Sequence, residues 1–394
     1  MHLANRTEWM KPSATVNTST RAKEMKAKGI DIINLSAGEP DFDTPDYIKQ
    51  KAIEALNLGH TKYTPPSGIA DLKMAVSEKF KNDNNLSFAL DEICITCGAK
   101  LGIYNALQIL VDPGDEVIIP SPYWVSYPTQ VELAGGKPVI LPLEDDLLID
   151  IEKLKKAVTK RTRAIIICSP SNPSGMIYSR ELLEAIASIC IKNNIFVISD
   201  EIYEKLTYDG VKHISIANVN PDIKNLSLIA NGFSKSYAMT GWRVGYMAAP
   251  KEFIQKMTSL QAQQLTGLPS FIQEACVTAL TKGNGDIERM RSEFEKRRNL
   301  IFDLVSSIPH VKVHKPQGAF YLLPDMREII ELSGSRSIKS SNYLTEHILT
   351  TAHVALVSGE PFGAPGYIRI SYASSEEDIK EAVQRLTVAL NHLK

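Results

Sequence analysis

The chain has 394 residues, of which 44% are hydrophobic and 23% are charged. This composition is typical of a folded globular protein rather than a disordered one, and the length favours two domains over a single core. With 44 basic and 45 acidic side chains the formal net charge is −1, so no excess of charge indicates a nucleic-acid or membrane-surface partner.

The N-terminus and the cysteines indicate the compartment. Residues 1–11 are polar and lack the apolar stretch of a signal peptide, and no run approaches the ~18 apolar residues of a membrane span. Cys94 and Cys97 form a CxxC motif, but no second pair accompanies it, so no metal site is expected. We therefore expect a cytoplasmic protein with reduced thiols.

Short β-rich segments alternate with amphipathic helical segments from about residue 90 onward. Strands are expected at residues 92–96, 116–120, 138–141, 163–168, 195–199, 226–230 and 244–249. Helices are expected after the first strand, ending at Leu110, and at residues 180–193, where apolar side chains recur on one face. This alternation predicts a mostly parallel sheet of about seven strands covered on both faces. Ligands of such sheets bind beyond the carboxyl ends of the strands.

The C-terminal part predicts a smaller α+β domain. A long helix at 286–306 is followed by candidate strands at 311–314, 319–323 and 367–372 and by a final helix from Ser375. We expect a large domain at 46–295 and a small domain that combines 1–45 with 296–394.

One segment carries most of the chemical information. Residues 232–245 follow an expected strand and contain Ser234, Lys235 and Arg243. A lysine in a partly desolvated pocket can form a Schiff base, and an arginine can hold a phosphate with its bidentate fork. An isolated lysine at a strand end is more often a solvated surface residue, but this whole stretch matches a known signature.

The stretch resembles the pyridoxal 5'-phosphate (PLP) attachment signature of class I and II aminotransferases. Nearly the whole chain is similar to the aspartate aminotransferases of subgroup Iβ. The resemblance implies the PLP-dependent transferase fold of type I and a cofactor aldimine on the catalytic Lys235. It implies ping-pong transfer from L-aspartate to 2-oxoglutarate, giving oxaloacetate and L-glutamate.

The resemblance also assigns residues to the cofactor ring. Asp200 ends a strand and would hold the proton of the pyridine nitrogen, although a lone aspartate there could be a helix N-cap. Tyr203 and Asn172 would bind the 3'-oxygen. Trp124 would stack on the ring, the alternative being a core aromatic.

Two further groups of residues are assigned to the phosphate. The main chain of Gly98, Ala99 and Lys100 would bind it, because the N–H groups at a helix N-terminus form an anion site. Ser234 and Arg243 would complete that site. Tyr63 would reach the phosphate of a neighbouring subunit, which implies a homodimer with shared sites; otherwise it is a tyrosine packed in a proline-rich loop.

The α-carboxylate of the substrate would be bound by Arg369, which lies in the expected strand at 367–372. A charge in that apolar strand needs a partner, which is either the substrate or a structural ion pair. Asn172 and Trp124 would also contact the substrate, and Gly38 would allow its close approach to the backbone.

The side-chain carboxylate of a dicarboxylic substrate would be bound by Thr15 and Lys100. The sequence from Val244 to Glu288 contains no arginine that could take this role. Lys11, together with the Thr15 and Lys100 pair, is associated in the subgroup with the use of prephenate. Transamination of prephenate, an aromatic aminotransferase, another PLP reaction and a non-catalytic regulator of the same fold remain the alternatives.

Overall fold

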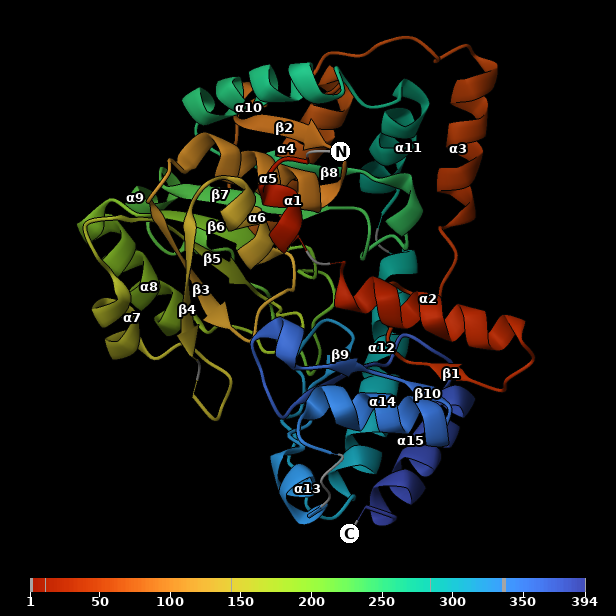
Figure 1. The fold of residues 1–394 in the computed structure, drawn as a ribbon. Helices are drawn as coiled ribbons and strands as arrows, with labels where there is room; N and C mark the ends of the chain where they lie inside the picture. Colours follow the sequence, from red (N-terminus) through yellow and green to blue (C-terminus); the bar gives the residue numbers. More distant parts are fainter. Residues whose placement is uncertain (1–2, 11, 143, 284, 335–337, 394) are drawn as a thin grey trace.

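The computed structural model describes residues 3–10, 12–142, 144–283, 285–334 and 338–393. Its centre is a seven-stranded sheet with the order β2-β8-β7-β6-β5-β3-β4 (Figure 1). The strands are β2 (Ile93–Thr96), β3 (Glu116–Ser121), β4 (Lys137–Pro142), β5 (Thr162–Cys168), β6 (Phe196–Asp200), β7 (Ser227–Gly232) and β8 (Gly245–Ala248). β8 runs antiparallel to both of its neighbours, and the other adjacent pairs are parallel. The predicted mostly parallel sheet is confirmed.

Both faces of this sheet are buried because successive side chains of a strand point to opposite faces. In β5, Ile165 and Ile167 join one apolar cluster, whereas Ile166 joins another. The first cluster includes side chains of α3 (Asp46–Asn57), α4 (Ala70–Asn84), α8 (Arg180–Asn193) and α11 (Ser270–Thr281). The second includes α5 (Gly98–Leu110), α6 (Tyr127–Leu133) and α10 (Lys251–Gln264).

A second apolar core is built around the C-terminal elements. A three-stranded sheet joins β11 (Val357–Ser358), β12 (Ile368–Ser371) and β9 (Tyr321–Leu322). Around it lie α12 (Gly285–Ser306), α13 (Arg327–Leu332), α14 (Ser341–Thr351) and α15 (Glu376–Asn391). Figure 1 shows this blue part below the large sheet.

The N-terminal segment contacts the C-terminal part of the chain. β1 (Ile33–Asn34) pairs in parallel with β10 (Val354–Ala355), and α2 (Ala14–Ala27) contacts both of these strands. Figure 1 shows α2 between the large sheet and the blue C-terminal elements. The division at residues 45 and 295 stays a prediction, and α12 continues as one helix through residue 295.

The expected strand at 311–314 is wrong. Lys312 forms only an isolated antiparallel bridge with Asp325. The alternating pattern is real, since Val311 is buried, but the partner segment enters α13 two residues after Asp325, so the pairing ends there.

The remaining helices are short, namely α1 (Arg6–Trp9), α7 (Ile151–Ala157) and α9 (Pro221–Lys224). The final helix begins after Ser375 as predicted, and the Ser375 hydroxyl caps it by accepting a hydrogen bond from the Asp378 amide. Among the helices that the structure describes, none combines the length and the apolar content needed to cross a membrane.

Candidate active site

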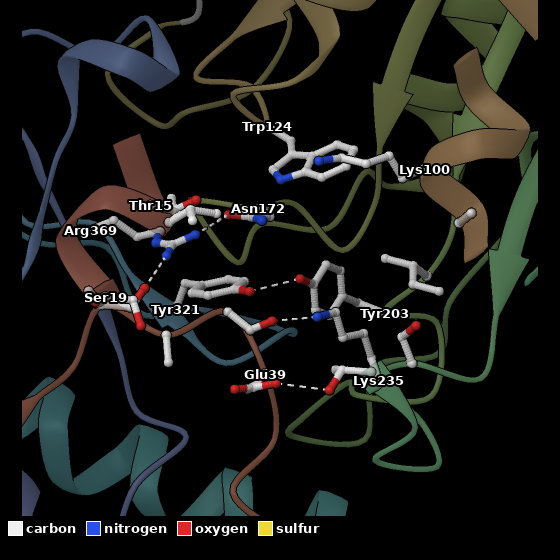
Figure 2. Close-up of a pocket in the computed structure, with 18 of the residues that line it drawn as sticks. Thr15, Ser19, Glu39, Lys100, Trp124, Asn172, Tyr203, Lys235, Tyr321 and Arg369 are labelled. Carbon is white, nitrogen blue, oxygen red and sulfur yellow. Dashed lines mark hydrogen bonds between the residues drawn. The ribbon is translucent and has the colours of Figure 1, made fainter. Parts of the chain in front are cut away.

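A cavity of about 500 Å³ opens at the carboxyl ends of the parallel strands. Cys168 at the end of β5 and Asp200 at the end of β6 line it, and so does Lys235 from the loop after β7. These three strands are neighbours in the sheet, so their ends meet at one edge. α2 and β12 close the cavity from the side of the C-terminal core (Figure 2).

The structure brings most of the predicted site residues to this cavity. Those that line it are Thr15, Gly38, Ala99, Lys100, Trp124, Asn172, Asp200, Tyr203, Ser234, Lys235, Arg243 and Arg369. Gly98 does not line the cavity but lies against the guanidinium of Arg243, which does. Tyr63 does not line the cavity, and its side chain is 91% exposed. Lys11 lies outside the described residues.

Lys235 directs its side-chain amine into the cavity. Its ammonium group donates a hydrogen bond to the Gly38 carbonyl and lies near the rings of Tyr203 and Phe320. Figure 2 shows the Lys235 side chain beside Tyr203. Burial lowers the pKa of Lys235 to about 8, although the nearby Glu39 carboxylate opposes this shift. A much larger share of the amine is therefore neutral and nucleophilic near neutral pH than for an ordinary lysine.

Asp200 provides a buried carboxylate on the sheet side of the cavity. The Tyr127 hydroxyl donates a 2.7 Å hydrogen bond to Asp200 Oδ2, and the Ile202 amide donates a 3.3 Å hydrogen bond to Oδ1. Burial raises the pKa of Asp200 to about 6. No lysine, arginine or histidine in the described ranges forms an ion pair with it. The carboxylate is thus suited to a cationic group of a ligand.

The N-terminus of α5 lies close to the guanidinium of Arg243. Gly98 has a φ of +74°, and a Cβ at this position would lie 2.6 Å from Nη2 of Arg243. Only glycine therefore lets the guanidinium approach the first turn of the helix. Arg243 is fixed by a 2.9 Å hydrogen bond from Nη1 to the Thr240 carbonyl. The main-chain N–H groups and this guanidinium fit a phosphate group.

Lys100 and Trp124 lie together at another part of the cavity wall. The Lys100 ammonium is 4.9 Å from the centroid of the Trp124 ring, and Figure 2 shows the two side chains side by side. Burial and the charge of Arg243 lower the pKa of Lys100. The Trp124 ring meets Tyr127 edge to face, with 5.4 Å between centroids.

Arg369 carries a buried positive charge, with only 1% of its surface exposed. It donates to Asn172 Oδ1 over 3.1 Å and to the Ser36 carbonyl over 2.7 Å, and its Nε has no partner. Within the described part of the chain no carboxylate pairs with it, which argues against the structural ion pair. An anionic ligand would supply the missing charge.

Sequence reasoning missed several residues that line the same cavity. Tyr127 supports Asp200, and its place three residues after Trp124 could have indicated it. Ser19 and Lys23 follow Thr15 at intervals of four residues, so one face of α2 points to the cavity. Tyr321 lies in the predicted strand at 319–323. Its polar hydroxyl in an apolar strand was the only sequence feature that could have indicated a role in the site.

The site therefore fits PLP on four counts: a lysine with a lowered pKa, a carboxylate and a guanidinium that form no ion pair with any described residue, and main-chain N–H groups of a helix N-terminus beside Arg243. Together, the fold and the site define a PLP-dependent enzyme of fold type I.

Comparison with known proteins gives the family. The family model "Aminotransferase class I and II" matches residues 30–386. An aspartate aminotransferase of Bacillus sp. strain YM-2 is 48% identical over 98% of both chains. A probable aspartate/prephenate aminotransferase of Aquifex aeolicus is 43% identical over 99% of both chains. The structure of Thermus thermophilus aspartate aminotransferase with maleate is 40% identical, with a TM-score of 0.93 over 99% of this chain and 100% of that one.

The chain belongs to the class I and II aminotransferases, and its cofactor is PLP. Amino acids and 2-oxo acids are the substrates of this family.

Proposed function

We propose that the protein is an aspartate aminotransferase that converts L-aspartate and 2-oxoglutarate to oxaloacetate and L-glutamate. One observation carries this proposal: besides Lys235 and Arg243, the same cavity is lined by further cationic side chains on different elements, among them Arg369 on β12 and Lys100 on α5. Arg369 would bind the α-carboxylate, and Lys100 with Thr15 would bind the side-chain carboxylate. The named substrates of similar proteins support this choice.

Each residue would have a separate task in the reaction. Bound at this site, PLP supplies an aldehyde that takes up the amino group and a ring that accepts electrons released at the α-carbon. Asp200 would hold a proton on the ring nitrogen, and Tyr203 and Asn172 would bind the ring oxygen. The phosphate would lie at Gly98, Ala99, Ser234 and Arg243.

Lys235 would hold the cofactor covalently and would also act as the general base. Once the amino group of the substrate has replaced Lys235 on the cofactor, the freed neutral amine of Lys235 would remove the α-proton of the bound amino acid and later return it on the cofactor side. Arg369 would orient the amino acid so that this proton faces Lys235, and Trp124 would cover the ring.

Prephenate is the second candidate acceptor. It is also a dicarboxylate, so the same pair of cationic groups would suit it, and the relative from Aquifex aeolicus is named for both activities. Lys11, which is associated with this activity, has no described position. An assay panel that includes oxaloacetate, 2-oxoglutarate and prephenate as acceptors decides between the two.

We further propose that two copies form a homodimer with shared sites and that the protein is cytoplasmic. Support for the dimer comes from Tyr63, which is 91% exposed, and from the exposed Ile53, Leu56 and Leu58 of the neighbouring helical segment. The cytoplasmic location is supported by the five cysteines, which are all free.

Substitution of Lys100 tests the proposed specificity. A Lys100→Met variant should lose about 10- to 100-fold in kcat/KM for aspartate, because a charge-assisted hydrogen bond contributes about 1.5–3 kcal/mol. Its activity with phenylalanine should be unchanged or higher. Lys137→Met, which changes an exposed lysine, is the control. An equal loss for both amino acids would contradict the specificity role.

A further inference from the structure

Tyr321 lies between Tyr203, which is proposed to bind the cofactor, and Arg369, which is proposed to bind the substrate. It comes from β9, is fully buried and lines the cavity. Figure 2 shows its ring beside Arg369 and its hydroxyl directed at Tyr203. It therefore touches both the residue proposed for the cofactor oxygen and the residue proposed for the substrate carboxylate.

The hydroxyl groups of Tyr321 and Tyr203 are 2.9 Å apart. Burial raises the pKa of both phenols, so both keep their protons at neutral pH. A phenol has one proton to donate. If Tyr203 donates to the ring oxygen of the cofactor, Tyr321 must be the donor in the bond between the two tyrosines. A hydroxyl that accepts one hydrogen bond donates the next one more strongly.

The ring of Tyr321 meets the guanidinium of Arg369. The Cζ atom of Arg369 is 4.5 Å from the centroid of this ring and 5.0 Å from the centroid of Phe362. Asn172 and Ser36 accept hydrogen bonds from the two terminal nitrogens, while Nε has no partner. The two aromatic rings thus help to orient the Arg369 guanidinium, which does not use all of its hydrogen-bond donors.

We propose that Tyr321 is a positioning residue with two separable actions. Its hydroxyl fixes Tyr203 as the donor to the cofactor ring oxygen, and its ring holds Arg369 in place for the substrate α-carboxylate. This inference rests on the roles proposed above for Tyr203 and Arg369.

The hydroxyl action is tested by Tyr321→Phe in the PLP-loaded enzyme. The visible absorbance is titrated against pH, since a weaker donor to the ring oxygen leaves the cofactor more basic. We expect the apparent pKa to rise by about half a unit, and Tyr203→Phe to raise it further. In a Tyr203→Phe background, Tyr321→Phe should add no further shift, because it acts only through Tyr203.

The ring action is tested with maleate as a dicarboxylate probe. Tyr321→Phe should bind maleate about as tightly as the parent enzyme, whereas Tyr321→Leu should bind it about tenfold more weakly because the cation–π contact is lost. Tyr321→Met is the substitute should the leucine variant not fold. Tyr372→Phe is the matched control: it removes another buried hydroxyl, bonded to the Ala319 carbonyl outside the cavity, and should change neither readout.

The outcomes separate this inference from the roles on which it rests. A shift with Tyr203→Phe and none with Tyr321→Phe would overturn the inference alone. No shift with either variant would overturn the proposed role of Tyr203 as well. A full Tyr321→Phe shift that persists in the Tyr203→Phe background would also contradict it, since the hydroxyl would then act by another route.

Discussion

At the residue scale, the site combines buried or half-buried ionisable groups that form no ion pair within the described part of the chain. Burial lowers the pKa of Lys235 and raises the pKa of Asp200, and no carboxylate among the described residues pairs with Arg369. A buried ionisable group without a partner lowers the stability of the folded protein. Each of these groups would gain a partner when cofactor and substrate bind. Lys235 and Asp200 were predicted from the resemblance to the aminotransferase signature, and Arg369 also because a charge in an apolar strand needs a partner.

The lowered pKa of Lys235 predicts how PLP uptake depends on pH. Only the neutral amine attacks an aldehyde, so the uptake rate of the cofactor-free protein should rise with pH and level off above about 8, well below the usual value of 10.5. Rapid-mixing absorbance measurements over a pH series give the midpoint. Nα-acetyl-lysine amide mixed with PLP is the control, and a protein midpoint above pH 10 would contradict the burial argument.

At the element scale, strand ends and one helix N-terminus provide the residues of the proposed cofactor site. The strands were predictable because their apolar runs alternate with helical segments, and the parallel order then places their carboxyl ends together. The face of α2 and the position of Tyr321 were not predictable, because they depend on how the C-terminal core meets the large sheet. The strand at 311–314 was predicted wrongly because alternation alone does not supply a pairing partner.

The first turn of α5 gives a test at this scale. Gly98→Ala should weaken PLP binding at least about tenfold, because a positive φ strains alanine by about 1–3 kcal/mol and the new Cβ would displace Arg243. Titration of the cofactor-free protein with PLP measures the affinity. Gly285→Ala, where an added Cβ meets no atom within 4 Å, is the control. Unchanged affinity in Gly98→Ala would show that the phosphate lies elsewhere.

At the scale of the whole molecule, the cavity lies where the large sheet, α2 and the C-terminal core meet. The sequence predicted two domains and an active site shared between two subunits. The structure of a single chain does not test the shared site. Tyr63 is the residue that would contribute to the active site of the partner chain, since it is exposed and lies outside the cavity of its own chain.

Mixed dimers test whether Tyr63 crosses to the partner. A Tyr63→Ala chain and a Lys235→Ala chain should each be weakly active or inactive alone. After unfolding and refolding together, a mixed dimer has one site with both native residues, so about a quarter of the parent activity should return in an equal mixture. No recovery, although mixed dimers have formed, would mean that Tyr63 serves its own chain or none.

The covalent attachment of PLP at Lys235 is the central claim, and borohydride reduction followed by peptide mass spectrometry tests it most directly. Reduction fixes a Schiff base as a stable amine, so the account predicts that the peptide with Lys235 carries the cofactor mass. A Lys235→Ala variant should carry none. A reduced cofactor on a different lysine, or unlabelled Lys235 in protein saturated with PLP, would contradict it.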